Sequence, residues 1–386
     1  MVETGGLSTF NIQHGYVEAL VRGMRNSFVS DSDYHHLTQC DTLEDCKLNL
    51  TESDYGASLQ NDSTLTPQDL QKAAVDKLAV EFQYLRSQAV APLAQFLDFI
   101  THEYMIENIM MLLKGTMAGR DINELIAQAH PLGMFKESTM RSVVAFESNA
   151  KGYADLYQCV LVDTPVGAYF SKFLQESSQN VGAAGEIRNV LEETEIEIIK
   201  ASLMKYYLED FYAFCSSLGG DTATIMCEIL SVRADTQAIN VTLNSFGTPL
   251  NDPSMRSTDR RRLYPSVGFL YPAGTSMLAQ ASDEESLGQV CSLYPGYASA
   301  WACHVENDDR SIDDAFFERD AALHELAFES QMHFGCFYAY VKLKEQEIRN
   351  LVWITECVMQ RQKEAVNQFI PLFSQHAPWR QKGGRR

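Results

Sequence analysis

The sequence predicts an all-α protein, and three observations support this fold class. Apolar residues recur at helical spacing over long stretches, alternation with a period of two is scarce, and no strand is followed by a glycine-rich loop and a helix. The chain has 386 residues, of which 45% are hydrophobic and 21% charged. This composition is typical of a globular protein with a large core.

The first helical stretch runs from Gln68 to Leu113 and is interrupted only by Pro92. A second runs from Thr194 to Leu218, where Gly219 and Gly220 provide a C-terminal stop.

The longest candidate helix runs from Phe316 to Phe369, without a proline and with a bend expected at Gly335. Residues 249–275 contain four of the eleven prolines and predict a connector, and 177–185 predicts a flexible loop.

Two faint signatures predict divergent helical repeats of about 110–130 residues. The pattern Leu-x-x-Cys-x-Leu-x-x-Thr starts at Leu43 and again at Leu156, with a looser version at Leu287. An acid also precedes an Asn-aliphatic pair by five residues in three places, although Glu44 fits this pattern outside the series. The three places are Glu103 with Asn108, Asp235 with Asn240, and Glu345 with Asn350. We expect repeats at 1–135, 136–265 and 266–373.

The net charge of −20 makes nucleic acid and a bare anionic membrane poor partners, because both attract cations. Residues 316–386 are the exception, with a net charge of +2. Their basic tail, 374–386, is expected to be disordered.

Other features indicate the cytosol. Residues 1–10 contain no apolar signal segment, and the longest apolar run, 330–341, is shorter than the ~20 residues of a membrane span. The nine cysteines show neither a CxxC motif nor zinc spacing, so we expect reduced thiols.

The sequence contains no common catalytic signature. Neither the phosphate-binding loop nor the HExxH motif occurs in it. The segment 307–314 resembles the aspartate-rich magnesium motif of all-α terpenoid synthases, with a spacing one residue off. Asp313 and Asp314 also suit the start of the following helix, and this capping interpretation is favoured. His324 and His333 are expected to be partly buried packing residues whose hydrogen bonds are satisfied. The sequence predicts no catalytic residue, metal or cofactor.

Longer sequence motifs identify the chain as a member of the family of subunit d of the eukaryotic V-type proton ATPase. This family is related to the C-like subunits of archaeal rotary ATPases. The motifs cover about residues 8–373, with departures at 179–189 and in the tail. They include Phe10–Tyr16, Cys40–Asp45, Ser53–Gly56, Pro92–Thr101, His130–Gly133, Leu161–Pro165, Asn244–Thr248 and, most distinctively, His333–Ile354.

The resemblance implies three pseudo-threefold helical units that form a funnel. It implies a non-catalytic adaptor that receives the central rotor shaft and turns with the proteolipid ring, and so supports ATP-driven proton transport. It also implies peripheral attachment at the cytoplasmic face of vacuolar, endosomal or lysosomal membranes. An unrelated cytosolic helical scaffold and the magnesium-dependent enzyme are the alternatives.

A partner-binding role is assigned to three carboxylates, Glu103, Asp235 and Glu345, because repeat-equivalent positions would converge on one axis. The competing interpretation, ordinary acids on helix faces, is favoured over it.

Overall fold

The structure is a computed structural model that describes residues 7–59, 65–135, 164–180, 193–306, 311–374 and 377. Every regular element among these residues is helical, so the predicted all-α class is confirmed. The chain divides into two compact units. Unit 1 comprises the described parts of 98–219 and 226–305, and unit 2 comprises those of 2–97, 220–225 and 306–386.

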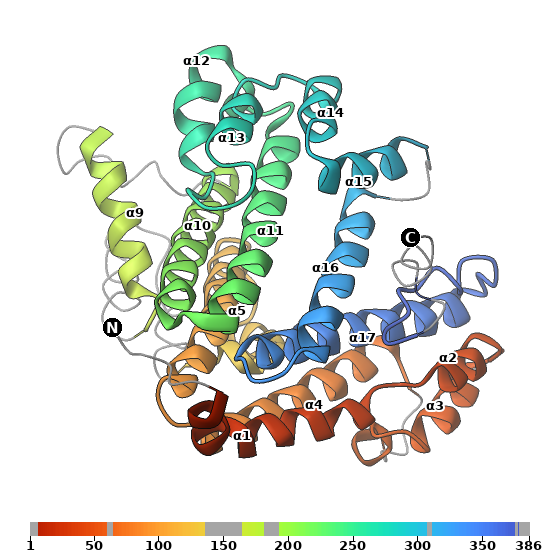
Figure 1. Cartoon of the computed structure of the whole chain (residues 1–386). Helices are drawn as coiled ribbons and strands as arrows, with labels where there is room; N and C mark the ends of the chain where they lie inside the picture. The colour runs from red at the N-terminus through yellow and green to blue at the C-terminus, as the bar shows by residue number, and fades with distance from the viewer. Residues whose placement is uncertain are drawn as a thin grey trace. The chain divides into compact units, whose positions relative to one another are not determined.

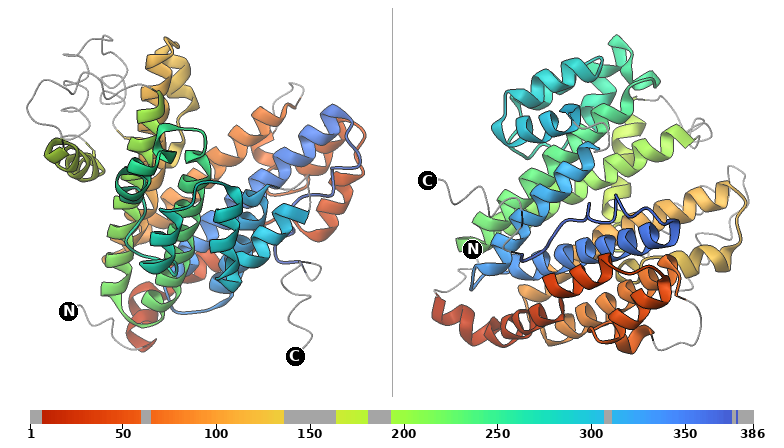
Figure 2. Two further views of the ribbon diagram at one scale, coloured as in Figure 1. Left: turned by 90° about the horizontal axis from the view of Figure 1, so that it is seen from above. Right: turned by 90° about the vertical axis from the view of Figure 1, so that its right-hand side faces the viewer.

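In unit 2, α17 is the central helix, and it packs along α16 and α4 (Figure 2). Most of its side chains are buried, including the aromatic cluster Phe337, Tyr338 and Tyr340. The shorter helices begin at capping boxes, in which Ser30 pairs with Asp33 and Thr42 with Asp45. The helices of unit 2 are α1 (Leu7–Gly23), α2 (Asp31–Thr38), α3 (Leu43–Thr51), α4 (Pro67–Gln88), α16 (Ile312–Glu329) and α17 (Gly335–Gln360).

Unit 1 is built around α5, α10 and α11 (Figure 1). Phe99 on α5 stacks on Phe211 and Phe214 of α10, with ring centroids 5.2 and 4.8 Å apart. The helices are α5 (Leu93–Met117), α6 (Ile122–Gln128), α9 (Gly167–Asn180), α10 (Glu193–Leu218), α11 (Gly220–Ser245), α12 (Pro253–Met255), α13 (Ala273–Leu278), α14 (Glu284–Ser292) and α15 (Pro295–Glu306); the unit boundaries fall within α5 and α11.

The predicted helix breaks lie at the expected residues. The chain leaves the helical path between α4 and α5, around Pro92. Helix α10 ends at Leu218, and Gly219 and Gly220 adopt φ of +69° and +56°, a region that favours glycine. Between α11 and α13 the chain forms only short helical turns, two of which begin at Pro249 and Pro253. This is the arrangement expected of a connector.

One predicted helix is wrong in length. The stretch from Phe316 to Phe369 is two helices, because the chain turns between Glu329 and Gly335, where Met332 has a φ of +62°. Helix α17 then ends at Gln360, since Arg361 adopts the left-handed conformation at the C-cap. The break therefore lies next to Gly335, where the sequence predicts a bend. The last helix, however, ends at Gln360 and not at Phe369.

Other expectations are met only in part or remain untested. Helix α9 continues to Asn180, so 177–180 is helical and not the expected loop, and 181–185 lies outside the described residues. The second copy of the first signature also lies outside them, except for Thr164. Ser374 is buried and its hydroxyl donates to Asp31, whereas most of the tail is not described. The repeat boundaries remain a prediction.

Candidate functional site

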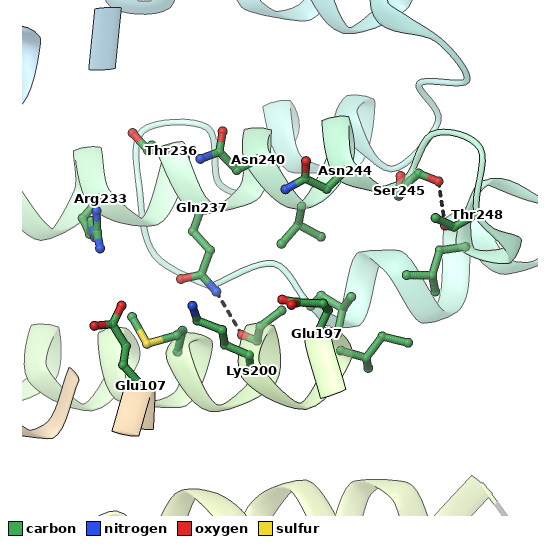
Figure 3. A pocket seen from close by; sticks show the side chains of 16 residues that line it. Glu107, Glu197, Lys200, Arg233, Thr236, Gln237, Asn240, Asn244, Ser245 and Thr248 are labelled. Carbon is green, nitrogen blue, oxygen red and sulfur yellow. Dashed lines mark hydrogen bonds between the residues drawn. The ribbon is translucent and has the colours of Figure 1, made fainter. Parts of the chain in front are cut away.

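A groove lined by both polar and apolar side chains lies between α10 and α11 in unit 1 (Figure 3). Its volume is about 540 Å³. Side chains spaced by three or four residues share one face of a helix, so α11 lines the groove with a row of polar groups. This row is Arg233, Gln237, Asn240 and Asn244, and α10 contributes Glu197, Lys200, Ala201 and Met204 opposite it.

Contacts across the groove hold the two helices together. The Gln237 amide donates to the carbonyl of Ala201 at 2.9 Å. Thr236 is 6% exposed, and its hydroxyl has no hydrogen-bond partner among the described residues. The groove therefore offers amides, a hydroxyl and charges of both signs, groups suited to hydrogen bonds with another protein surface.

Glu103, the first nominated carboxylate, does not line this groove but pairs with Arg233, which does. It is 4% exposed, and Arg233 donates to it at 2.6 Å from α11. The carboxylate is therefore committed within unit 1, and the arginine is the member of the pair that lines the groove. Sequence reasoning missed Arg233, because no local spacing links residues 130 positions apart.

Asp235, the second nominee, is 1% exposed and serves as an acceptor for three donors. The backbone N–H groups of Phe269 and Leu270 donate to it at 2.9 and 3.1 Å, and the Tyr297 hydroxyl donates at 2.6 Å. This carboxylate fixes the backbone at the end of the proline-rich connector.

Glu345, the third nominee, belongs to unit 2. Its side chain is 20% exposed and pairs with Lys342 at 3.1 Å on the same helix. The structure thus brings Glu103 and Asp235 into one unit with Arg233 and leaves Glu345 in the other. A contact between any of the three and a partner remains a prediction.

The asparagines of the same signature have a common local role at two of three positions. The Asn108 amide donates to the carbonyl of His130 at 2.9 Å and accepts from its N–H at 2.7 Å. Asn350 makes the same pair of bonds with Ile370, at 2.6 and 3.2 Å. In both cases the clamped residue precedes a Pro-Leu pair. Asn240 instead lines the groove.

The aspartate-rich segment begins a helix. Ser311 is the N-cap of α16, and its hydroxyl and the Asp314 carboxylate form a capping box, with Asp313 also in the first turn. The capping interpretation is confirmed for these residues, and 307–310 lies outside the described part. Where the chain is described, no group of three His, Cys, Asp or Glu side chains is arranged to hold a metal ion.

The remaining predicted features concern histidines, thiols and hydrophobic helices. His324 and His333 are 6% and 0% exposed, so both are buried, as a packing role requires. The hydrogen bonds expected for them are not seen at His333, whose ring nitrogens have no partner among the described residues. All eight cysteines that the structure describes are free. Across the described ranges, no helix has both the length and the hydrophobicity to cross a bilayer.

These features define a class of protein: an all-helical chain in which the buried carboxylates Glu103 and Asp235 are bound by other residues of the same chain. The chain belongs to the ATP synthase (C/AC39) subunit family, whose model matches residues 17–369.

Three relatives show the extent of this similarity. V-type proton ATPase subunit d of Dictyostelium discoideum is 44% identical over 370 residues, which cover 96% of this chain and 98% of the relative. V-type proton ATPase subunit d1 of Arabidopsis thaliana is 39% identical over 363 residues, 94% of this chain and 97% of the relative. V-type proton ATPase subunit d of Saccharomyces cerevisiae is 37% identical over 367 residues, 94% of this chain and 99% of the relative.

Proposed function

We propose that this chain is a non-catalytic subunit of a V-type proton ATPase that couples the central rotor shaft to the proteolipid ring. The observation that carries the proposal is the similarity to relatives named V-type proton ATPase subunit d, which spans nearly the whole of both chains. The chain then supports ATP-driven proton transport from the cytoplasmic face of vacuolar, endosomal or lysosomal membranes, without binding a cofactor.

The physical character of the fold supports a role in transmitting force. Close-packed helices have low compressibility and therefore pass strain from one surface to another. In unit 1, aromatic stacking between α5 and α10 and the ion pair between Glu103 and Arg233 tie neighbouring helices together. Such a unit suits a coupling element.

The threefold funnel is part of this proposal. Its support is local, since Asn108 in unit 1 and Asn350 in unit 2 clamp the backbone 22 and 20 residues further on in the same manner. In this scheme the groove of α10 and α11 faces a shaft subunit, with Arg233 as the contacting group and Glu103 as the carboxylate that orients it. Asp235 acts through the backbone that it binds, and Glu345 contacts a partner directly.

The test is to delete the chain from cells and measure ATP-driven acidification of isolated vesicles, with the full chain restored as the control. We expect acidification to be lost on deletion and recovered on restoration. In the same vesicles, peripheral proteins are stripped, and the chain is expected to remain with the proteolipid ring. Normal acidification without the chain, or its release with general cytosolic proteins, would favour an unrelated scaffold.

A further inference from the structure

Lys200 lines the groove between α10 and α11 without a partner for its charge. The residue is half-buried, and its side chain extends from α10 toward α11 (Figure 3). No carboxylate or other acceptor in the described part of the chain contacts its ammonium group. Two apolar side chains of the same lining, Ile198 and Met204, come from the same helix. The groove thus presents, on a partly apolar wall, a cation that the described chain does not neutralise.

The other charged side chains of the lining are engaged within the chain. Arg233 donates to Glu103 at 2.6 Å. Glu197 pairs with Lys114, and Glu107 also has contacts of its own. An ion pair between one of these groups and a second protein would compete with an existing contact, whereas an ion pair with the remaining cation would not.

Two uncharged groups of the same groove can bind a partner as well. Thr236 is 6% exposed, and its hydroxyl has no hydrogen-bond partner among the described residues. The exposed Asn244 amide lies further along α11 and also lines the groove. A buried hydroxyl that makes no hydrogen bond costs free energy, so a bond from a second protein would recover that cost. The groove therefore offers hydrogen bonds in addition to an ion pair.

The unpaired ammonium determines the chemistry of the partner. A protein that covers the groove removes water from Lys200, and a cation that loses its hydration is stabilised when an anion comes into contact with it. The anions that proteins carry are the carboxylates of Asp and Glu. The partner segment must therefore place an acidic side chain opposite Lys200, with apolar side chains next to it for Ile198 and Met204.

We propose that Lys200 forms an ion pair with an acidic side chain of another subunit of the pump, which docks in the groove between α10 and α11. This inference rests on the proposed function and names the ionic contact that the groove makes. Arg233 can still donate hydrogen bonds to the partner, but its charge is matched by Glu103.

The first experiment treats vesicles that carry the full complex with a carbodiimide. This reagent joins an ammonium group to the carboxylate with which it pairs through an amide bond, and takes up the released water to become a urea. Mass spectrometry of the peptides should find Lys200 joined to an Asp or Glu of another V-type ATPase subunit. A product that joins Lys200 to this chain itself, in the same or a second copy, overturns the inference, as does the lack of any product at Lys200.

Lys200→Arg is the matched variant for this experiment. Its guanidinium keeps the charge and the ion pair but does not form the amide. We therefore expect the cross-link to disappear while the partner subunit still binds.

The second experiment measures binding with the tagged full chain in cells that lack the native copy. After a salt wash, recovery of the cross-linked subunit should fall about tenfold for Lys200→Met, because the carboxylate of the partner is then buried without a counter-ion. Lys205→Met is the control. Lys205 is a half-buried lysine of the same helix that does not line the groove, and its ammonium donates to the carbonyl of Arg262 at 2.9 Å. Recovery should stay at the wild-type level for this control and for Lys200→Arg.

Thermal unfolding of the purified chain separates binding from folding. The midpoint of Lys200→Met should equal that of the wild type, because no described residue of the chain binds this ammonium. Wild-type recovery of the partner subunit with Lys200→Met overturns the inference. If acidification survives deletion of the whole chain, the proposed function fails. If deletion abolishes acidification and Lys200→Met leaves the recovery unchanged, only the ion pair of Lys200 fails.

Discussion

At the scale of single residues, a buried ion pair on α17 connects distant parts of unit 2. Lys344 is 2% exposed and Glu347 is fully buried, and Nζ lies 2.8 Å from Oε1. Glu347 also accepts from the Tyr55 hydroxyl and from the Val29 N–H, each at 2.6 Å. Burial, with the charge of Glu347, raises the pKa of Tyr55 well above its ordinary value. The carboxylate is therefore fully hydrogen-bonded despite its burial.

We predict that Glu347→Leu lowers the free energy of unfolding by about 3–5 kcal/mol, because it leaves the Lys344 ammonium buried without its counter-ion. Adding Lys344→Met should recover part of this loss, since the unpaired charge is then removed. Urea unfolding of both single variants and the double variant measures the coupling. Losses that simply add would contradict the prediction.

At the scale of elements, the junction between α16 and α17 is held by polar contacts around a neutral histidine. The Met332 N–H donates to Glu18 at 2.8 Å, and the Phe334 N–H donates to Thr222 at 3.0 Å. His333 is completely buried, and its two ring nitrogens have no hydrogen-bond partner among the described residues.

Burial lowers the pKa of His333, and the nearby charge of Arg22 lowers it further, whereas Glu18, the Ser330 backbone and Asp221 oppose the shift. His14, which lies edge-on to Phe334 at 5.0 Å, also has a pKa lowered by burial.

Acid should therefore destabilise this junction. Below a pH of about 6.5 the unfolded histidine binds a proton that the folded one does not, so stability is complete above that pH and is lost as the pH falls. The loss should approach about 1.4 kcal/mol per pH unit for each such histidine. Thermal unfolding at pH values of about 7.5, 6.5 and 5.5, on either side of the ordinary histidine pKa, measures it. His333→Phe should reduce the slope and exposed His35→Gln should not; an unchanged slope in His333→Phe would refute the assignment.

At the scale of the whole chain, the asparagine clamp recurs in both units. Asn108 and Asn350 lie on different helices, and each one binds both backbone groups of a single residue in a following segment. A buried N–H and C=O left unpaired cost more than the bonds contribute when made. Each clamp supplies the partner of one backbone N–H, that of His130 or of Ile370, whereas the carbonyl of His130 also accepts from the Gly133 N–H at 3.0 Å.

Asn108→Ala and Asn350→Ala should each reduce the free energy of unfolding by about 2–3 kcal/mol. Hydrogen exchange should also accelerate locally, at His130 in the first variant and at Ile370 in the second. Exposed Asn244→Ala serves as the control and should change neither quantity. Protection at Ile370 that survives Asn350→Ala would show that the clamp is dispensable there.

Much of the fold could be predicted because its signals are local. Apolar spacing predicts the helices, Pro92 and the pair Gly219–Gly220 mark breaks through their backbone restrictions, and Asp313 with Asp314 suits a first helical turn. The end of α17 could not be predicted in this way, because Arg361 adopts a left-handed conformation that its residue type does not favour.

The sequence by itself determined the all-α class and the main helix boundaries, because these depend on neighbouring residues. It also determined the family, because the family's sequence motifs occur in the same order along the chain. Only the tertiary structure decided which acids are buried and what binds them. Glu103 meets Arg233 across 130 residues, and Val29 meets Glu347 across 318. Such pairs form only when packing closes long loops, and no local pattern encodes them. The same packing buries Leu270 while leaving Phe269 and Tyr271 exposed on either side of it.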